Sequence, residues 1–294
     1  QHTAEFDRSV EVGAGARLDL LLQNPDQSRI EGDLTLAAGA VLETYGLDLE
    51  LRGDARLAHG SVLRAGGLFV QETGVFATDA EIEVQRLAID GGGLWLTGGA
   101  LRVGDELDAD PEAAIRLESA DLLLSGDSGP RQVSGDFQMR NGVLASNDEL
   151  WLEGPFHDDR APLLLERVSI DAESLSFRGV SILSGELRSE TSIDDSAELR
   201  IIGDTTAYAP VGNLGRIVVL SGDLAFLAGL NNQGSIVFVD GGEGEGPTLT
   251  VMSDLLVRTR ADFVLPPGGR LVVAGSLRID ALFSRSDISF AGVD

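Results

Sequence analysis

The sequence predicts an all-β protein that folds as a single elongated right-handed parallel β-helix, a type of β-solenoid. The first observation is a recurring run of alternating apolar residues followed by Gly, Asp or Ser, as in LTLAAG from residue 34, LWLTGG from 94 and IVFVDGG from 236. This period of two, bounded by turn residues, is typical of short strands. The second is composition: 37 glycines and only 5% aromatic residues suit many tight turns around a narrow aliphatic core.

The third observation is repetition. A Gly-Asp or Gly-Ser pair precedes many of the predicted strands, at positions 32, 53, 104, 135, 222 and 275. The first two pairs are 21 residues apart and the later spacings are irregular. Degenerate repetition of this kind favours a solenoid over a closed globule. At roughly 20 to 25 residues per coil and about 4.8 Å per coil, we expect about a dozen coils in a rod of about 60 Å.

The sequence contains no convincing amphipathic helix. The best helical candidate, DPEAAIRLESADLLL from residue 110, could form one turn, but IRLES and DLLLSG within it also fit strands. The alternative all-β architecture is a pair of tandem β-sandwiches. Sandwiches commonly depend on large core aromatics, and the chain has only two Trp and two Tyr, so the solenoid is favoured.

Along the chain, we expect residues 1–30 to form an N-terminal lead-in that caps the first coil. Residues 31–294 then form the solenoid, with loop excursions near 153–166 and 203–215. The first excursion carries two prolines and a charge cluster, and the second begins with GDTTAYAPVG. The pattern of short strands is the same on both sides of each excursion, so one domain is predicted.

The charge balance restricts the partners. The chain has a formal net charge of −26, and all 22 basic residues are Arg. An acidic excess of this size opposes binding to nucleic-acid backbones and to anionic membranes. Cys is absent, which excludes disulfides, thiolate nucleophiles and Cys-based zinc sites. No apolar run approaches the roughly 20 residues that span a bilayer. Because the chain starts with Gln1, we expect a processed or trimmed form, and removal of a signal peptide fits.

The segment GDLAFLAGLNNQGSIVFVDGG, residues 222–242, carries the closest likeness to a known family. Its LAGLNNQG core is similar to the turn-and-strand repeat of filamentous-haemagglutinin-type adhesins. The chain as a whole resembles the right-handed β-helices of bacterial surface proteins, including autotransporter passengers. Asn is sparser and the acidity higher than in that class, and the start lacks a recognisable secretion-domain motif. The resemblance implies a secreted, extracellular or cell-surface location of bacterial type.

The glycines of LAIDGGGLWLTGGALRV, from residue 87, superficially suggest a phosphate-binding loop. Gly93, Gly98 and Gly99 supply its first half, but Ala100 and Leu101 stand where such a loop needs Lys and Ser or Thr. The chain has no Lys, and no helix follows to present its N-terminus. These glycines are therefore predicted to be turn residues, with no bound cofactor.

Calcium is a more serious alternative. The predicted ligands lie in DELDADPE and are Asp105, Glu106, Asp108, Asp110 and Glu112. Carboxylates at alternating positions converge when they lie in a loop, and Ca²⁺ prefers such oxygen ligands. A weaker second candidate is DGGEGEGPTLTV, residues 240–251, which resembles one copy of a calcium-binding β-roll repeat with Gly246 in place of a ligating Asp. Solvated acidic faces are the simpler explanation of both runs.

The sequence shows no convincing catalytic constellation. The cluster most like a site is His157, Asp158, Asp159 and Arg160. In β-helix polysaccharide lyases and hydrolases, to which the alternative hypothesis assigns this chain, Asp groups act with Arg or a second Asp on one face. Sugar clefts also offer stacking aromatics, which are scarce here. A surface turn is the simpler explanation of the cluster.

The function predicted from these features is a non-enzymatic extracellular or cell-surface segment, structural or adhesive, that assembles into a filament or coat. The final residues, DISFAGVD from 287, fit an uncapped strand, so self-association through the solenoid ends is expected. A surface glycan or a host-cell ligand is the expected external partner, with neither nucleic acid nor membrane insertion. The alternative is a polysaccharide-active β-helix enzyme.

Overall fold

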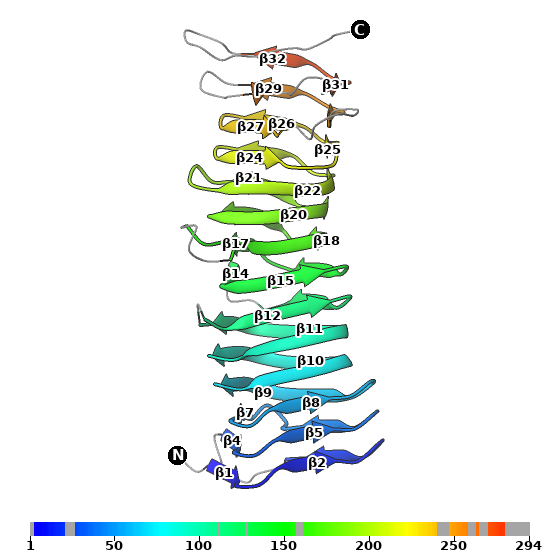
Figure 1. The fold of residues 1–294 in the computed structure, drawn as a ribbon, viewed down its shortest axis with the longest axis vertical. Coiled ribbons are helices and arrows are strands. Elements are labelled where there is room, and N and C mark those ends of the chain that lie inside the picture. The colour runs from blue at the N-terminus through cyan, green and yellow to red at the C-terminus, as the bar shows by residue number, and fades with distance from the viewer. Residues whose placement is uncertain are drawn as a thin grey trace. The chain divides into compact units, whose positions relative to one another are not determined.

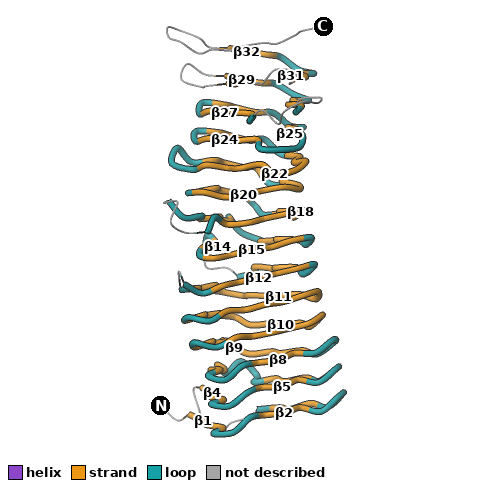
Figure 2. The backbone as a smooth tube through the Cα atoms, in the orientation of Figure 1, coloured by secondary structure: helices purple, strands orange, loops and turns teal. Residues whose placement is uncertain are grey.

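A computed structural model shows that the chain is an all-β parallel β-solenoid of about 12 turns, as predicted (Figures 1 and 2). The structure describes residues 3–20, 27–110, 112–126, 129–156, 161–239, 247–257, 263–264 and 270–279. Every regular element in these ranges is a strand, and none of them contains a helix able to span a membrane. The strand pairs are parallel, which excludes tandem antiparallel sandwiches. The chain divides into two compact units, Gln1–Asp148 and Glu149–Asp294.

The strands of unit 1 fall at three positions in each coil. They are β1 (Thr3–Phe6), β2 (Val10–Val12), β3 (Arg17–Asp19), β4 (Gln27–Ile30), β5 (Leu34–Leu36), β6 (Val41–Glu43), β7 (Asp48–Leu51), β8 (Ala55–Leu57), β9 (Val62–Gln71), β10 (Gly74–Asp90), β11 (Gly93–Ala109), β12 (Ala114–Glu118), β13 (Asp121–Leu124), β14 (Arg131–Ser134), β15 (Asp136–Arg140) and β16 (Val143–Ser146). The long strands β9, β10 and β11 continue around a corner, so each contributes to two strand positions.

Inward-facing residues of unit 1 stack in columns, one residue per coil. One column is formed by Val12, Leu36, Leu57, Ala77, Leu96, Leu117 and Met139, and all seven are buried. Because the parallel register places like positions directly above one another, each aliphatic side chain packs against two others of its kind. Full burial of a Leu or Met side chain contributes about 1.5–3 kcal/mol, so these columns are the main source of stability.

The recurring Gly-Asp pair links one coil to the next. Asp33 Oδ1 accepts a hydrogen bond from the backbone N–H of Asp54 (3.1 Å), and Asp54 Oδ1 accepts one from Gly74 (3.2 Å). The glycine is required because the coils approach closely: a Cβ on Gly53 would lie 2.4 Å from the carbonyl carbon of Gly32. In each pair, the Asp side chain therefore accepts a backbone N–H of the next coil. The Gly before it is needed because the corner has no room for a side chain.

One ion pair in unit 1 joins coils that are not neighbours. Asp48, Gly67 and Arg86 occupy the same position in three successive coils. Arg86 Nη2 lies 2.9 Å and 2.8 Å from the two carboxylate oxygens of Asp48. Gly67 makes this contact sterically accessible, because a Cβ at that position would lie 2.7 Å from Asp48 Oδ1.

Unit 2 repeats the three-position coil. Its strands are β17 (Leu150–Glu153), β18 (Leu163–Asp171), β19 (Ser174–Arg178), β20 (Val180–Leu187), β21 (Glu190–Ile193), β22 (Glu198–Ala207), β23 (Val211–Asn213), β24 (Arg216–Val219), β25 (Leu224–Phe226), β26 (Leu230–Asn232), β27 (Ser235–Phe238), β28 (Thr248–Val251), β29 (Leu255–Val257), β30 (Phe263–Val264), β31 (Arg270–Val273) and β32 (Leu277–Ile279). Strands β17, β19, β21, β23, β26, β29 and β32 belong to one sheet.

A buried asparagine pair interrupts the apolar interior of unit 2. Asn213 and Asn232 are fully buried and follow Ile193 in one inward column. Asn213 Nδ2 donates to Asn232 Oδ1 (2.6 Å) and to the carbonyl of Ser235 (3.2 Å). The two amides satisfy each other in part, as buried polar groups must.

Replacing Asn232 alone with Leu is expected to lower the free energy of unfolding by about 2 kcal/mol, because the buried Asn213 amide loses its side-chain partner. The double variant Asn213→Leu/Asn232→Leu is expected to recover most of this loss, since both polar groups are then gone. Urea denaturation of the two variants and the wild type measures the coupling. Additive losses in the double variant would contradict a mutually satisfied pair.

Several local predictions differ from the structure. Strands β1, β2 and β3, in the expected lead-in 1–30, pair with β4, β5 and β6 as a regular first coil. The expected excursion at 203–215 contains the end of β22 and all of β23, because Thr205, Ala207 and Val211 point into the interior. In the expected excursion at 153–166, β18 already begins at Leu163. In the weak helical candidate from residue 110, the segments IRLES and DLLLSG form strands β12 and β13, which confirms the strand alternative.

Candidate functional site

The glycine-rich stretch from residue 87 consists of strands and corners. The predicted strand LAI ends β10, while LWL and LRV both lie in the single long strand β11. Gly98 and Gly99 form the corner within β11, with φ angles of 74° and 79°. A Cβ on Gly99 would lie 2.1 Å from the carbonyl oxygen of Ala80. The positive φ angles and the close stacking of coils therefore account for glycine at this corner.

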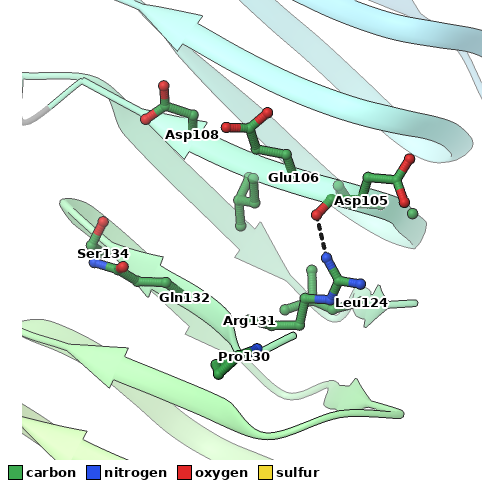
Figure 3. A pocket seen from close by; sticks show the side chains of 11 residues that line it. Asp105, Glu106, Asp108, Leu124, Pro130, Arg131, Gln132 and Ser134 are labelled. Carbon is green, nitrogen blue, oxygen red and sulfur yellow. Dashed lines mark hydrogen bonds between the residues drawn. The ribbon is translucent and has the colours of Figure 1, made fainter. Parts of the chain in front are cut away.

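The strand pairing of unit 1 is interrupted just after this stretch, at the end of β11. Residues 106–109 of β11 pair with β10 on one side, but β14, which comes next at this position of the coil, belongs to a different sheet. A cavity of about 330 Å³ lies at this break (Figure 3). Its lining consists of Val103, Gly104, Asp105, Glu106, Leu107, Asp108, Leu124, Pro130, Arg131, Gln132 and Ser134.

Arg131 holds the two sides of the break together. Its side chain is buried, and Nη1 donates a hydrogen bond to the backbone carbonyl of Asp105 (Figure 3). Its Nη2 lies 3.5 Å from a carboxylate oxygen of Asp148. Burial alternates along β14, with Arg131 and Val133 buried and Gln132 exposed. The guanidinium thus occupies an inward position and replaces part of the hydrogen bonding that a paired strand would provide.

The structure places the five predicted calcium ligands at two locations. Asp105, Glu106 and Asp108 line the cavity from β11, whereas Asp110 and Glu112 lie beyond it, where Asp110 Oδ1 accepts the backbone N–H of Glu112 (2.9 Å). Among the described residues, no three carboxylate or imidazole groups are close enough to hold a metal ion. An extended strand explains this, because it separates alternate residues by about 6.6 Å and sends adjacent ones to opposite faces.

The cavity has an acidic rim above a buried cation. Asp105, Glu106 and Asp108 are exposed, and within the described ranges none of them forms an ion pair. The groups available for chemistry on one wall are therefore carboxylates. Across the break lie the guanidinium of Arg131, the amide of Gln132 and the hydroxyl of Ser134 (Figure 3). Such a set suits hydrogen bonding to a polar, hydroxylated ligand.

Sequence reasoning missed the residues of β14. The available signal was the segment RQVS, in which Arg131 takes the inward place of an alternating pattern. The other predicted sites, His157 to Arg160 and residues 240–246, lie outside the described residues, as does the predicted final strand from 287.

Replacing Arg131 with Ala is expected to lower the free energy of unfolding by about 3 kcal/mol, because it leaves a backbone carbonyl and the Asp148 carboxylate without this partner. Glu106→Gln, on the exposed rim of the same cavity, is expected to change it by less than about 0.5 kcal/mol. Thermal and urea unfolding measure both. Equal stability of the two variants would show that Arg131 does not hold the break.

Comparison of the chain with protein-family models, with curated proteins and with solved structures finds no match. The fold therefore rests on the strand pairing of the chain itself.

Proposed function

We propose that the chain is a non-enzymatic, structural and adhesive segment of a secreted or cell-surface protein, and that its solenoid coils assemble end to end. The observation that carries this proposal is the edge pairing by which the coils stack. Strands β1, β2 and β3 pair with β4, β5 and β6 in the parallel register that the later coils repeat. A strand edge of this kind is a template for pairing with a further coil.

The direction of the backbone groups identifies the open edge at β2. The N–H of Val10 donates to the carbonyl of Asp33 (2.8 Å), and the carbonyl of Val12 accepts from Ala37 (3.0 Å). Because successive residues of a parallel strand direct their N–H and C=O groups to opposite sides, those of Glu11 point to the open edge. Among the described residues, the outward backbone groups of Glu11 can therefore bond a further strand without breaking a bond between β2 and β5.

Glu11→Pro tests end-to-end assembly, because proline removes the outward N–H while an edge strand tolerates it. Wild-type protein is expected to form rods that lengthen with concentration in electron micrographs, and the Glu11→Pro variant is expected to stay short. Glu11→Ala keeps the N–H and controls for loss of the carboxylate. Wild-type protein that stays unassembled at every concentration, or Glu11→Pro rods as long as wild type, would refute the proposal.

An adhesive role is supported by an aromatic pair on the outer face of unit 1. Phe76 and Trp95, in the same column of β10 and β11, stack with ring centroids 4.8 Å apart and an interplanar angle of 7°. Phe76 is 42% exposed, and Arg56 and Arg116 adjoin the pair in the same column. An exposed ring stacked on a half-buried one, with guanidinium groups on either side, is suited to a surface glycan. Loss of glycan-array binding in Trp95→Ala is the expected result, and unchanged binding would contradict it.

A second candidate function, polysaccharide cleavage, is favoured by the cavity at the β11–β14 break. Asp105, Glu106 and Asp108 line this cavity together with Arg131, and carboxylates beside a guanidinium are suited to general acid–base work on a sugar chain. Incubation with acidic and neutral polysaccharides, with and without calcium, distinguishes the two functions. The structural proposal predicts no new reducing or unsaturated ends. Activity that disappears in Asp108→Asn would instead establish the enzyme.

A further inference from the structure

Unit 2 contains a segment with almost no charge. Residues 205–239 include only Arg216 and Asp223 as charged residues and are therefore neutral, whereas the whole chain carries −26. The segment runs from the end of β22 to the residue after β27. A neutral stretch of this length in so acidic a chain indicates a surface with a different task from the rest.

The outer face of β22, β25, β28 and β31 carries two adjacent uncharged columns, which we call the neutral face. The first column lies within the strands, and the second lies two residues further along, where each strand ends. The columns are Thr206, Ala225, Thr250 and Val272, and Tyr208, Leu227, Met252 and Ala274.

Backbone hydrogen bonds fix the second column. Leu227 N–H donates to the carbonyl of Ala207, Met252 N–H to that of Phe226, and Ala274 N–H to that of Val251, at 2.8–2.9 Å. The large side chains point outward: Tyr208 is 47% exposed, Leu227 38% and Met252 52%. Apolar residues are thus held at one corner, one per coil, against solvent.

Charged residues border the neutral face in the coil that precedes it. In the preceding coil, Glu186 and Arg188 form an ion pair of 2.7 Å. The Arg188 guanidinium also lies 5.7 Å from the centroid of the Tyr208 ring, and the Tyr208 hydroxyl bonds Glu186 at 3.4 Å. Both charges are therefore already engaged, and the boundary of the apolar surface is sharp.

We propose that the neutral face binds the same face of a second copy of the chain, side by side. Two copies that each carry −26 repel one another through most of their surfaces, and contact costs least where neither brings charge. A face that binds itself forms a two-fold contact. A two-fold axis along the strand direction, midway between β25 and β28, reverses the order of the coils. Leu227 then meets Met252 of the other copy, Tyr208 meets Ala274, and the Glu186–Arg188 pair stays outside the contact.

This contact is separate from end-to-end pairing through β1, β2 and β3, since it uses side chains of unit 2 and no open backbone edge. Its small area makes a weak dimer, with a dissociation constant in the micromolar range or above. Salt screens the repulsion between copies, so association strengthens as the NaCl concentration rises.

Sedimentation equilibrium tests the contact with two matched variants. Leu227→Asp places a charge beside the two-fold axis and is expected to weaken the dimer at least tenfold. Leu214→Asp places the same charge on a 51% exposed Leu at a different corner, and it is expected to change the constant less than twofold. A wild type that stays monomeric at millimolar concentration in high salt, or equal effects of the two variants, overturns the proposal.

Cross-linking gives an independent readout because the chain has no Cys. The Leu227→Cys variant is expected to form disulfide-linked dimers at least ten times faster than Thr97→Cys, which lies exposed on β11 of unit 1. Equal rates overturn the two-fold contact. Adding Glu11→Pro to the Leu227→Cys variant separates the two modes of assembly: it shortens rods and leaves the cross-link rate unchanged.

Discussion

Replacing Phe137 with Ala is expected to lower the free energy of unfolding by about 4 kcal/mol. Phe137 is fully buried in β15, in one inward column with Leu94 and Ile115. The loss has two parts, which are the removed apolar surface and the cavity left behind. The cavity persists because the backbone ladder holds adjacent coils at about 4.8 Å and prevents collapse around the missing ring.

Urea unfolding followed by circular dichroism measures this loss. Gln138→Ala, one residue along the same strand and outside the inward column, is the matched control and is expected to change stability by less than about 0.5 kcal/mol. A Phe137→Ala loss below about 1 kcal/mol would mean that the coils do collapse, and the rigid-ladder explanation would then fail.

Replacing Glu50 with Gln is expected to lower the free energy of unfolding by about 2–3 kcal/mol near neutral pH. The Glu50 side chain is only 3% exposed and accepts hydrogen bonds from Arg29 and Arg52, each at 2.8 Å. Removing its charge leaves two guanidinium groups beside a neutral amide. Glu83→Gln breaks the exposed pair with Arg64, at 3.0 Å, and is expected to cost less than about 0.5 kcal/mol.

The difference in free energy of unfolding between wild type and Glu50→Gln depends on pH. Burial acts to raise the pKa of Glu50, but the hydrogen bonds and charges of Arg52 and Arg29 outweigh it, so the pKa lies below its ordinary value of 4.5. The stabilisation is therefore fully present above pH 4.5 and is lost as the pH falls through the lower pKa of the folded state. The gap between wild type and Glu50→Gln should narrow only below pH 4.5, and a gap independent of pH would contradict this account.

Much of the fold could be predicted because its signals are local. Alternation marked LWL and LRV as strand residues, and the absence of helical periodicity indicated coils of strands. The Gly-Asp pairs were recognised as a repeat, although their function was not. Pairing Asp33 with the next coil requires the register between coils, which a local pattern does not contain.

The excursion expected at 203–215 shows the limit of turn signals. Pro210 and the glycines around it are typical of a loop, yet Thr205 and Val211 are buried and paired in strands. A solenoid corner and a protruding loop use the same residues. Only the inward direction of the flanking side chains distinguishes them, and that direction is fixed by neighbouring coils.

The cavity could not be predicted for a related reason. Asp105, Glu106 and Asp108 were identified as acidic neighbours, and an assumed loop suggested that they converge. Continuation of β11 through these residues separates their side chains instead. Arg131 comes 26 residues after Asp105, and only the stacking of one coil on the next brings the two together.

The contact between Asp48 and Arg86 has a consequence for how unit 1 opens. In a solenoid where each coil touches only its neighbours, coils can unfold one at a time from an end. A pair that reaches past Gly67 ties three coils into one cooperative block. Amide protons of β7, β9 and β10 should then exchange with solvent in a single shared opening event, while coils outside this block fray independently.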